Sequence, residues 1–196
     1  SSAAFFIVLA LLTKNSEIII KSVSLNKTRT GLIGILRQMG GKIEIKNVTD
    51  GKGEKVGDIR VSSSQLKNIE IPNAIIPNII DEIPILSVAG AFAEGNFKIT
   101  GAKELRVKES DRIKSLCQNF NKAGLVINEY EDGFELKGNV TNEQVMFESF
   151  GDHRIAMAFG VFSMLMKNGS SVNEFECVGI SNPNFVEQIN HLITSP

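Results

Sequence analysis

Three segments of the chain are apolar almost all the way round a helix, and this feature constrains the fold most. They are residues 3–12 (AAFFIVLALL), 83–93 (IPILSVAGAFA) and 155–166 (IAMAFGVFSMLM). A helix without a polar face is stable only when it is buried on most sides. A membrane-spanning helix needs roughly 20 apolar residues, which none of the three reaches. We therefore expect three helices packed inside the protein, and no membrane contact.

Each apolar helix opens a similar series of elements: the helix, a strand, an amphipathic helix, and one or two further strands. We place the three copies at about 1–65, 78–140 and 150–196, within a single domain that covers residues 1–196. Gly or Asn-Gly follows most of these helices, as a left-handed helix end requires. The repetition predicts a pseudo-symmetric α/β domain of three similar units, with three helices packed inside and β-sheets around them.

The boundaries follow from caps, turns and periodicity. Ser2, Asp81 and Asp152 each precede an apolar run, as helix N-caps do. A Gly-rich hairpin turn is expected at residues 50–53. The expected helices are 2–13, 28–39, 81–93, 109–123, 152–166 and 183–193; the expected strands are 17–23, 42–46, 58–62, 68–71, 97–100, 125–129, 134–137 and 171–175.

Composition excludes several classes of protein. The 196 residues are 42% hydrophobic and 22% charged, which is typical of a globular chain and not of a disordered one. The net charge of −1 leaves no basic excess for a nucleic-acid backbone. Cys117 and Cys177 form no CxxC motif, and His153 and His191 do not stand at zinc-ligand spacing from them. We expect no metal and no cofactor, and two lone thiols favour a reducing cytoplasm.

Charged residues collect at the starts of the expected helices, in segments 81–82, 106–112 and 152–154. If the three units are related by a pseudo-threefold axis, these helix starts face the same side of the molecule. Each start has free N–H groups and a partial positive charge, which attract anions. Guanidinium groups add two-pronged binding of carboxylate and phosphate. The sequence therefore predicts an anion site with carboxylates among three cations, Lys108, Arg112 and Arg154.

Each cluster also has a purely structural interpretation. Asp81 can be a helix cap and nothing more. Residues 103–112 can form an exposed turn held by ion pairs, the usual fate of a charge run. His153 can be a surface residue beside a solvated cap. The occurrence of three clusters at equivalent places of a repeat favours the functional interpretation.

Two strings in these clusters resemble a known family. LRVKESDRI (105–113) followed by GDHRIAMAFGV (151–161) is similar to the 5-enolpyruvylshikimate-3-phosphate (EPSP) synthases. The opening SSAAFF, residues 76–95 and residues 182–189 (NPNFVEQI) resemble that family too. The chain looks like the C-terminal portion only of a member of that family. The resemblance covers the chain from end to end and implies an enolpyruvyl-transferase-like α/β fold of pseudo-threefold repeated units, with buried parallel helices and outer β-sheets. The partner it implies is the missing N-terminal domain, without which we expect this chain to be inactive.

The resemblance also implies a reaction and its catalytic residues. An enolpyruvyl group moves from phosphoenolpyruvate to the 5-hydroxyl of shikimate 3-phosphate by addition and elimination, and phosphate is released. Asp81 would contact the ring hydroxyls and act as a base. Lys108 would assist the proton of the attacking hydroxyl. Glu109 would exchange a proton with the methylene carbon of phosphoenolpyruvate.

Further residues are implied as substrate ligands. Arg112 and Arg154 would clamp the carboxylate and phosphate of phosphoenolpyruvate, with His153 in support. Asp81 and Lys108 would also bind substrate.

Two departures from the family pattern affect the residue mapping. Glu104 stands where some members have an Asn that touches the shikimate phosphate, and no Lys lies near Ile180. Two alternatives stay open: a non-catalytic anion-binding domain, and an enolpyruvyl transferase that acts on a UDP-sugar.

Overall fold

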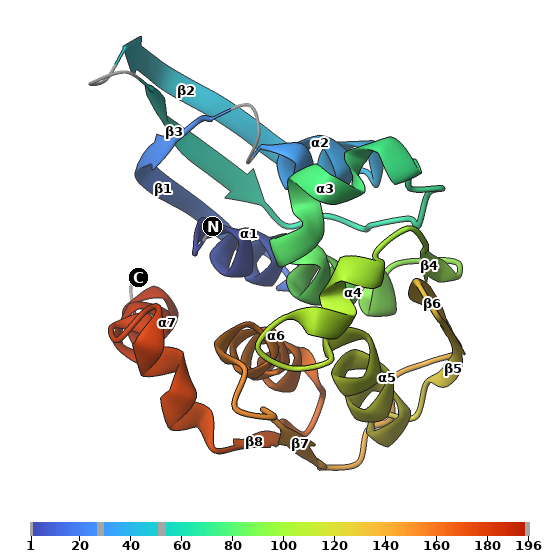
Figure 1. The fold of residues 1–196 in the computed structure, drawn as a ribbon. Helices are drawn as coiled ribbons and strands as arrows, with labels where there is room; N and C mark the ends of the chain where they lie inside the picture. The colour runs from blue at the N-terminus through green and yellow to red at the C-terminus, as the bar shows by residue number, and fades with distance from the viewer. Residues whose placement is uncertain (1, 27–29, 51–53, 195–196) are drawn as a thin grey trace.

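Three buried helices form the centre of the protein (Figure 1). The structure, a computed structural model, describes residues 2–26, 30–50 and 54–194. The central helices are α1 (Ala3–Leu12), α4 (Ile83–Phe92) and α6 (His153–Leu165), and each contacts the other two. Their last residues line one hollow of about 960 Å³. The three helices therefore run in the same direction, and their burial confirms the expectation from the apolar runs.

Three small sheets lie outside these helices (Figure 1). Two are antiparallel, and in each the last strand of the unit is central, with orders β1-β3-β2 and β4-β6-β5. The third sheet is a parallel pair, β7 with β8. The strands are β1 (Glu17–Ser24), β2 (Lys42–Asp50), β3 (Lys55–Ser62), β4 (Phe97–Ile99), β5 (Val126–Tyr130), β6 (Gly133–Lys137), β7 (Met146–Glu148) and β8 (Ser171–Asn173).

Amphipathic helices complete the described structure: α2 (Gly31–Gln38), α5 (Arg112–Lys122) and α7 (Phe185–Thr194). On α5, the ring of Phe120 packs against Phe159 of α6, tilted by 58° with centroids 5.0 Å apart. On α7, the ring of Phe185 packs against Phe5 and Phe6 of α1, with centroids 5.9 and 5.6 Å away. Aromatic contacts of this kind join α5 and α7 to the central helices.

The expected strand at 68–71 is wrong. One isolated bridge, between Lys67 and Glu94, replaces it. The side chain of Asn68 donates to the carbonyls of Gly90 and Gly95, so it ties this segment to the end of α4. The connector beyond it is partly helical, with η1 (Asn73–Ile75), α3 (Ile76–Ile79) and η2 (Ile80–Glu82).

Two of the three expected N-caps are also wrong. Neither Ser2 nor Asp81 accepts a capping hydrogen bond. Asp81 lies within η2, so the turn before α4 is already helical. Asp152 does cap α6, because its carboxylate accepts the N–H groups of Arg154 and Ile155. Of the three apolar runs, only that of α6 is preceded by a residue in extended backbone, as a capping side chain requires.

Other boundaries shift by a few residues. Helix α5 begins at Arg112 and not at Glu109, with Asp111 as its cap, after a 3₁₀ segment η3 (Lys103–Val107). Strand β8 stops before η4 (Phe175–Ile180), and α7 starts two residues after Pro183. Strand β7 was not expected. The turn at 51–53 and the expected helix start at 28–29 lie outside the described residues.

One helical stretch passes a length and composition test for crossing a membrane, Asn73–Phe92. The expectation of no membrane contact considered only the three apolar runs, and this stretch is longer than the run at 83–93 because it includes the preceding connector. The stretch is a chain of four short elements, and 61% of its most apolar window is buried inside the protein. Burial of this kind is typical of a core helix.

The β4–β6 pair predicts a strong effect of a small substitution. A Cβ at Gly133 would lie 2.0 Å from the backbone oxygen of Ile99. We expect Gly133→Ala to lower the free energy of unfolding by about 1–3 kcal/mol, because the two strands must move apart. Gly34 in α2 has nothing within 4 Å of the same position, so Gly34→Ala should stabilise the chain by about 0.5–1 kcal/mol. Urea unfolding of both variants checks the pair, and equal effects would contradict the prediction.

Candidate functional site

The segments that precede α4, α5 and α6 meet at one place, and Asp81 lies at the centre. Its carboxylate is 3.2 Å from Nη1 of Arg112, 3.7 Å from Nη2 of Arg154 and 3.9 Å from Nζ of Lys108. Nη1 of Arg154 also donates to the backbone oxygen of Asp81 at 2.9 Å. Residues from the three charged clusters of the sequence are therefore in direct contact.

A buried ion pair joins α5 to α6. Nε of Arg112 donates to Oδ2 of Asp152 at 2.7 Å, and Nη2 reaches Oδ1 at 3.3 Å. Arg112 is 2% exposed and Asp152 is fully buried. Burial alone would raise the pKa of Asp152, but the hydrogen bonds and charge of Arg112, with the N–H groups of α6, hold this pKa below its usual range.

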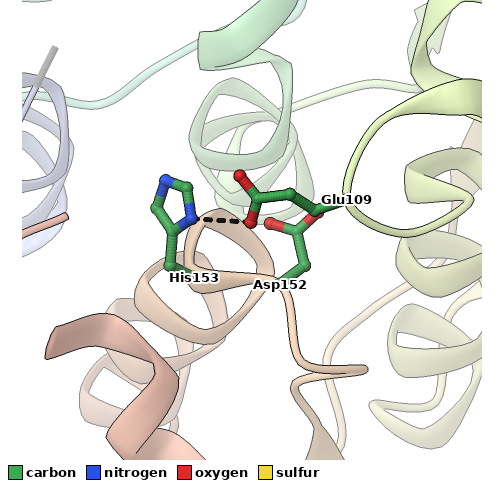
Figure 2. Close-up of side chains that lie close together, drawn as sticks. All are labelled: Glu109, Asp152 and His153. Carbon is green, nitrogen blue, oxygen red and sulfur yellow. Dashed lines mark hydrogen bonds and ion pairs between the residues drawn. The ribbon is translucent and has the colours of Figure 1, made fainter. Parts of the chain in front are cut away.

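Glu109 and His153 form a second pair next to the Arg112–Asp152 pair. Nδ1 of His153 lies 2.7 Å from Oε2 of Glu109, and Figure 2 shows the two side chains facing each other next to Asp152. The other oxygen of Glu109 is 3.9 Å from Nη2 of Arg112. Glu109 lies in the loop between η3 and α5, and its side chain is 46% exposed. This carboxylate is held by the protein and is still accessible to a ligand.

Glu109, Asp152 and His153 could together suggest a metal site. Among the described residues, they form the group of possible metal ligands whose ligand atoms all lie within 4.8 Å of one another. Both oxygens of Asp152 already accept hydrogen bonds, from Arg112, Ser110 and the start of α6. Nη2 of Arg112 also lies 3.3 Å from Asp152 and 3.9 Å from Glu109, so a guanidinium cation already stands beside both carboxylates. We interpret the group as a hydrogen-bonded cluster.

The charge balance of the site differs from the sequence expectation. Among the described residues, the network contains the three expected cations but five carboxylates, including Glu82 and Glu104. The first N–H groups of α6 are occupied by Asp152 and therefore do not form an anion site. The site is therefore not an electropositive surface, because each of the three cations is paired with an acid.

Glu82 is a buried acid that sequence reasoning did not assign to the site. Its side chain is 10% exposed, and Oε1 lies 3.9 Å from Nη1 of Arg154. Burial raises the pKa of Glu82, and the charge of Arg154 opposes this effect only in part. The one sequence signal was its position directly after Asp81 and before an apolar run.

Glu82→Gln should stabilise the chain at neutral pH and have less effect in acid. The folded-state pKa is raised, so the buried carboxyl destabilises the fold once pH exceeds the unfolded value of about 4.3. Below that pH both states are protonated and the variants should be alike. Thermal unfolding at pH 4 and pH 7.5 measures this difference. A larger gain in acid than at neutral pH would contradict the sign.

All six residues that the sequence proposes for the site belong to one connected network: Asp81, Lys108, Glu109, Arg112, His153 and Arg154. Arg112, expected to clamp a ligand, is 2% exposed and is paired with the carboxylates of Asp81 and Asp152. Lys108 is also paired with Glu104, one of the two departures from the family pattern. Asp152 and Ser110 were not predicted as site residues, although Asp152 was recognised as a helix cap.

Comparison with known proteins places the chain in a family. The sequence profile of EPSP synthase (3-phosphoshikimate 1-carboxyvinyltransferase) matches residues 1–189. This chain belongs to the EPSP synthase family. A 3-phosphoshikimate 1-carboxyvinyltransferase from Geotalea daltonii is 49% identical over 94% of the chain, and one from Petrotoga mobilis is 48% identical over 95%. The matches cover 43% and 44% of those proteins, so the chain spans less than half their length.

Comparison with solved structures shows that the chain has the fold of an EPSP synthase. The EPSP synthase of Acinetobacter baumannii superposes with a TM-score of 0.91 at 38% identity, over 97% of this chain and 45% of the other. The enolpyruvyl transferase NikO of Streptomyces tendae has a TM-score of 0.67 at 14% identity, which shows a shared fold only. The α/β architecture expected from the repeat and the enolpyruvyl-transferase-like fold implied by the resemblance are both confirmed.

Proposed function

We propose that this chain supplies one side of the active site of an EPSP synthase. The reaction transfers the enolpyruvyl group of phosphoenolpyruvate to the 5-hydroxyl of shikimate 3-phosphate. The observation that carries the proposal is the single network around Asp81, in a chain whose relatives are named for that activity. We place the reaction in the cytoplasm.

The addition step uses a proton donor and a base. The hydroxyl oxygen bonds to C2 of phosphoenolpyruvate, while C3 takes up a proton and becomes a methyl group. Glu109 is the proposed donor, since its carboxyl is partly exposed and is oriented by His153. Asp81 and Lys108 are proposed to bind the attacking hydroxyl and take its proton, because they lie side by side at 3.9 Å.

The elimination step reverses the proton transfer at the same carbon. The methyl group loses a proton to Glu109, the C2–C3 double bond forms, and phosphate leaves C2. Arg154 is the better placed arginine for a ligand anion, with a side chain that is 15% exposed. Arg112 has a 2% exposed side chain, so it holds the carboxylates in place and contributes charge through them.

The acid-rich network explains why we expect a partner. Two phosphates and a carboxylate need more cations than the paired ones described here. We propose that the N-terminal domain of the same enzyme supplies them and closes over Asp81 and Glu109. The isolated chain is then expected to have no turnover.

A hybrid enzyme tests the proposal. In the Geotalea daltonii relative, the segment matched by this chain is replaced by residues 1–196; we call this protein the hybrid enzyme. Phosphate release from phosphoenolpyruvate should require shikimate 3-phosphate. A folded hybrid enzyme that binds both compounds without turnover would favour a non-catalytic anion-binding domain. Turnover with a UDP-sugar instead would favour the other alternative.

A further inference from the structure

The loop that carries Lys108 and Glu109 is held by polar contacts and not by an apolar anchor. It runs from the end of η3 to the start of α5, and residues 108–111 belong to no helix or strand. Val107 is 81% exposed, so it does not anchor the loop by burial. The polar contacts at the base of the loop therefore matter for Lys108 and Glu109, because catalytic groups need positions accurate to a fraction of an ångström.

Arg106 makes an unusually complete set of hydrogen bonds at the base of this loop. Nη1 donates to both oxygens of Asp111, at 3.2 and 3.0 Å, and to Glu129 at 2.7 Å. Nη2 donates to the backbone oxygen of Tyr130 at 2.5 Å, and Nε to that of Glu131 at 3.1 Å. All three nitrogens are therefore used within the protein, and the side chain is 23% exposed.

These contacts close the loop at both ends. Arg106 lies at one end and Asp111 at the other, so their ion pair joins the two sides of a segment that contains Lys108 and Glu109. Oδ1 of Asp111 also accepts the N–H of Lys114 and caps α5, the helix that begins with Arg112. The three acceptors in residues 129–131 attach Arg106, and with it this end of the loop, to the end of β5.

We propose that Arg106 is a positioning residue of the active site. It clamps the loop 106–111 to the β5–β6 hairpin and thereby sets Lys108 and Glu109 against His153 and Arg112. This inference rests on the proposed function for its effect on turnover. A lysine cannot replace Arg106, because a single ammonium cannot reach Asp111 and the carbonyls of residues 130 and 131 together.

The first test needs no activity and uses the 196-residue chain. His153 and His191 are the two histidines of the chain, and His153 contacts Glu109. Glu109→Gln removes the carboxylate charge beside His153 and gives the reference shift of the His153 imidazole NMR signals. Arg106→Lys, and the milder Glu129→Gln, should move the same signals and leave those of His191 in place. Unchanged His153 signals in both variants, with a clear shift in Glu109→Gln, would overturn the proposal.

The second test uses the hybrid enzyme. Arg106→Lys should lower kcat at least 10-fold with a smaller change in the KM of both substrates, since Lys108 and Glu109 are displaced while Asp81 and Arg154 lie outside the loop. Lys103→Ala is the matched control, because Lys103 pairs with Glu131 of the same hairpin in an exposed contact, and its kcat should change less than twofold. Methylguanidine should restore part of the kcat of Arg106→Ala.

The outcomes separate the two proposals. Normal kcat in a folded Arg106→Lys hybrid enzyme removes the positioning role and leaves the proposed function intact. An inactive parent hybrid enzyme, with the His153 shifts observed in the chain, removes the proposed function and leaves the role of Arg106 in holding Glu109.

Discussion

Glu109→Gln in the hybrid enzyme should lower kcat by about 10²–10⁴-fold, with little change in the KM of either substrate. General acid–base catalysis contributes rate factors of this size, and glutamine keeps the shape of the side chain without its exchangeable carboxyl proton. The 2.7 Å contact with His153 can be retained by the amide oxygen. Steady-state kinetics with both substrates measures the split between kcat and KM.

Glu104→Gln is the matched control for this prediction. Glu104 is a carboxylate on the preceding 3₁₀ segment, 61% exposed, and it pairs with Lys108. Its loss removes a negative charge near the same site, but no proton donor, so kcat should change only a few-fold. Equal losses in the two variants would show that charge, and not proton transfer by Glu109, limits the reaction.

Asp152→Asn should destabilise the chain by about 3–5 kcal/mol at neutral pH, the usual effect of removing one partner of a buried ion pair. The substitution leaves Arg112 buried with a weaker partner and weakens the cap of α6. The folded-state pKa of Asp152 is lowered, so its contribution is complete above the unfolded pKa of about 3.9 and is lost as pH falls further. The difference between wild type and variant should therefore shrink below about pH 4.

Urea unfolding at several pH values between 3 and 7 measures this difference. Asp58→Asn is the control, since Asp58 also accepts two hydrogen bonds, from the N–H of Ser22 and from Asn47, but on the exposed face of a sheet. Its effect should be small at every pH. A similar small effect for Asp152→Asn would mean that the Arg112–Asp152 pair does not hold α5 to α6.

The apolar runs and glycine turns predicted most of the fold because burial on all sides leaves a helix few arrangements. The helices α1, α4 and α6 and the two antiparallel sheets lie where the sequence placed them, within a few residues. Two of the errors concern contacts distant in sequence. Asn68 bonds to Gly90 and Gly95 and not to a neighbouring strand, and β7 pairs with β8 across 25 residues of chain. No local pattern contains that information.

The chemistry of the site divides in the same way. The strings around Glu109 and Asp152 were sufficient to name the residues, because helix starts and charged triplets are local features. The strings did not show how these residues pair. Arg112 is paired with Asp152 and Asp81, and Arg106 is bound by three residues of the β5–β6 hairpin. The sequence by itself determined which side chains are present and roughly where each helix begins. Only the tertiary structure decided which charges are buried together, since burial and ion pairing depend on packing between segments that lie tens of residues apart.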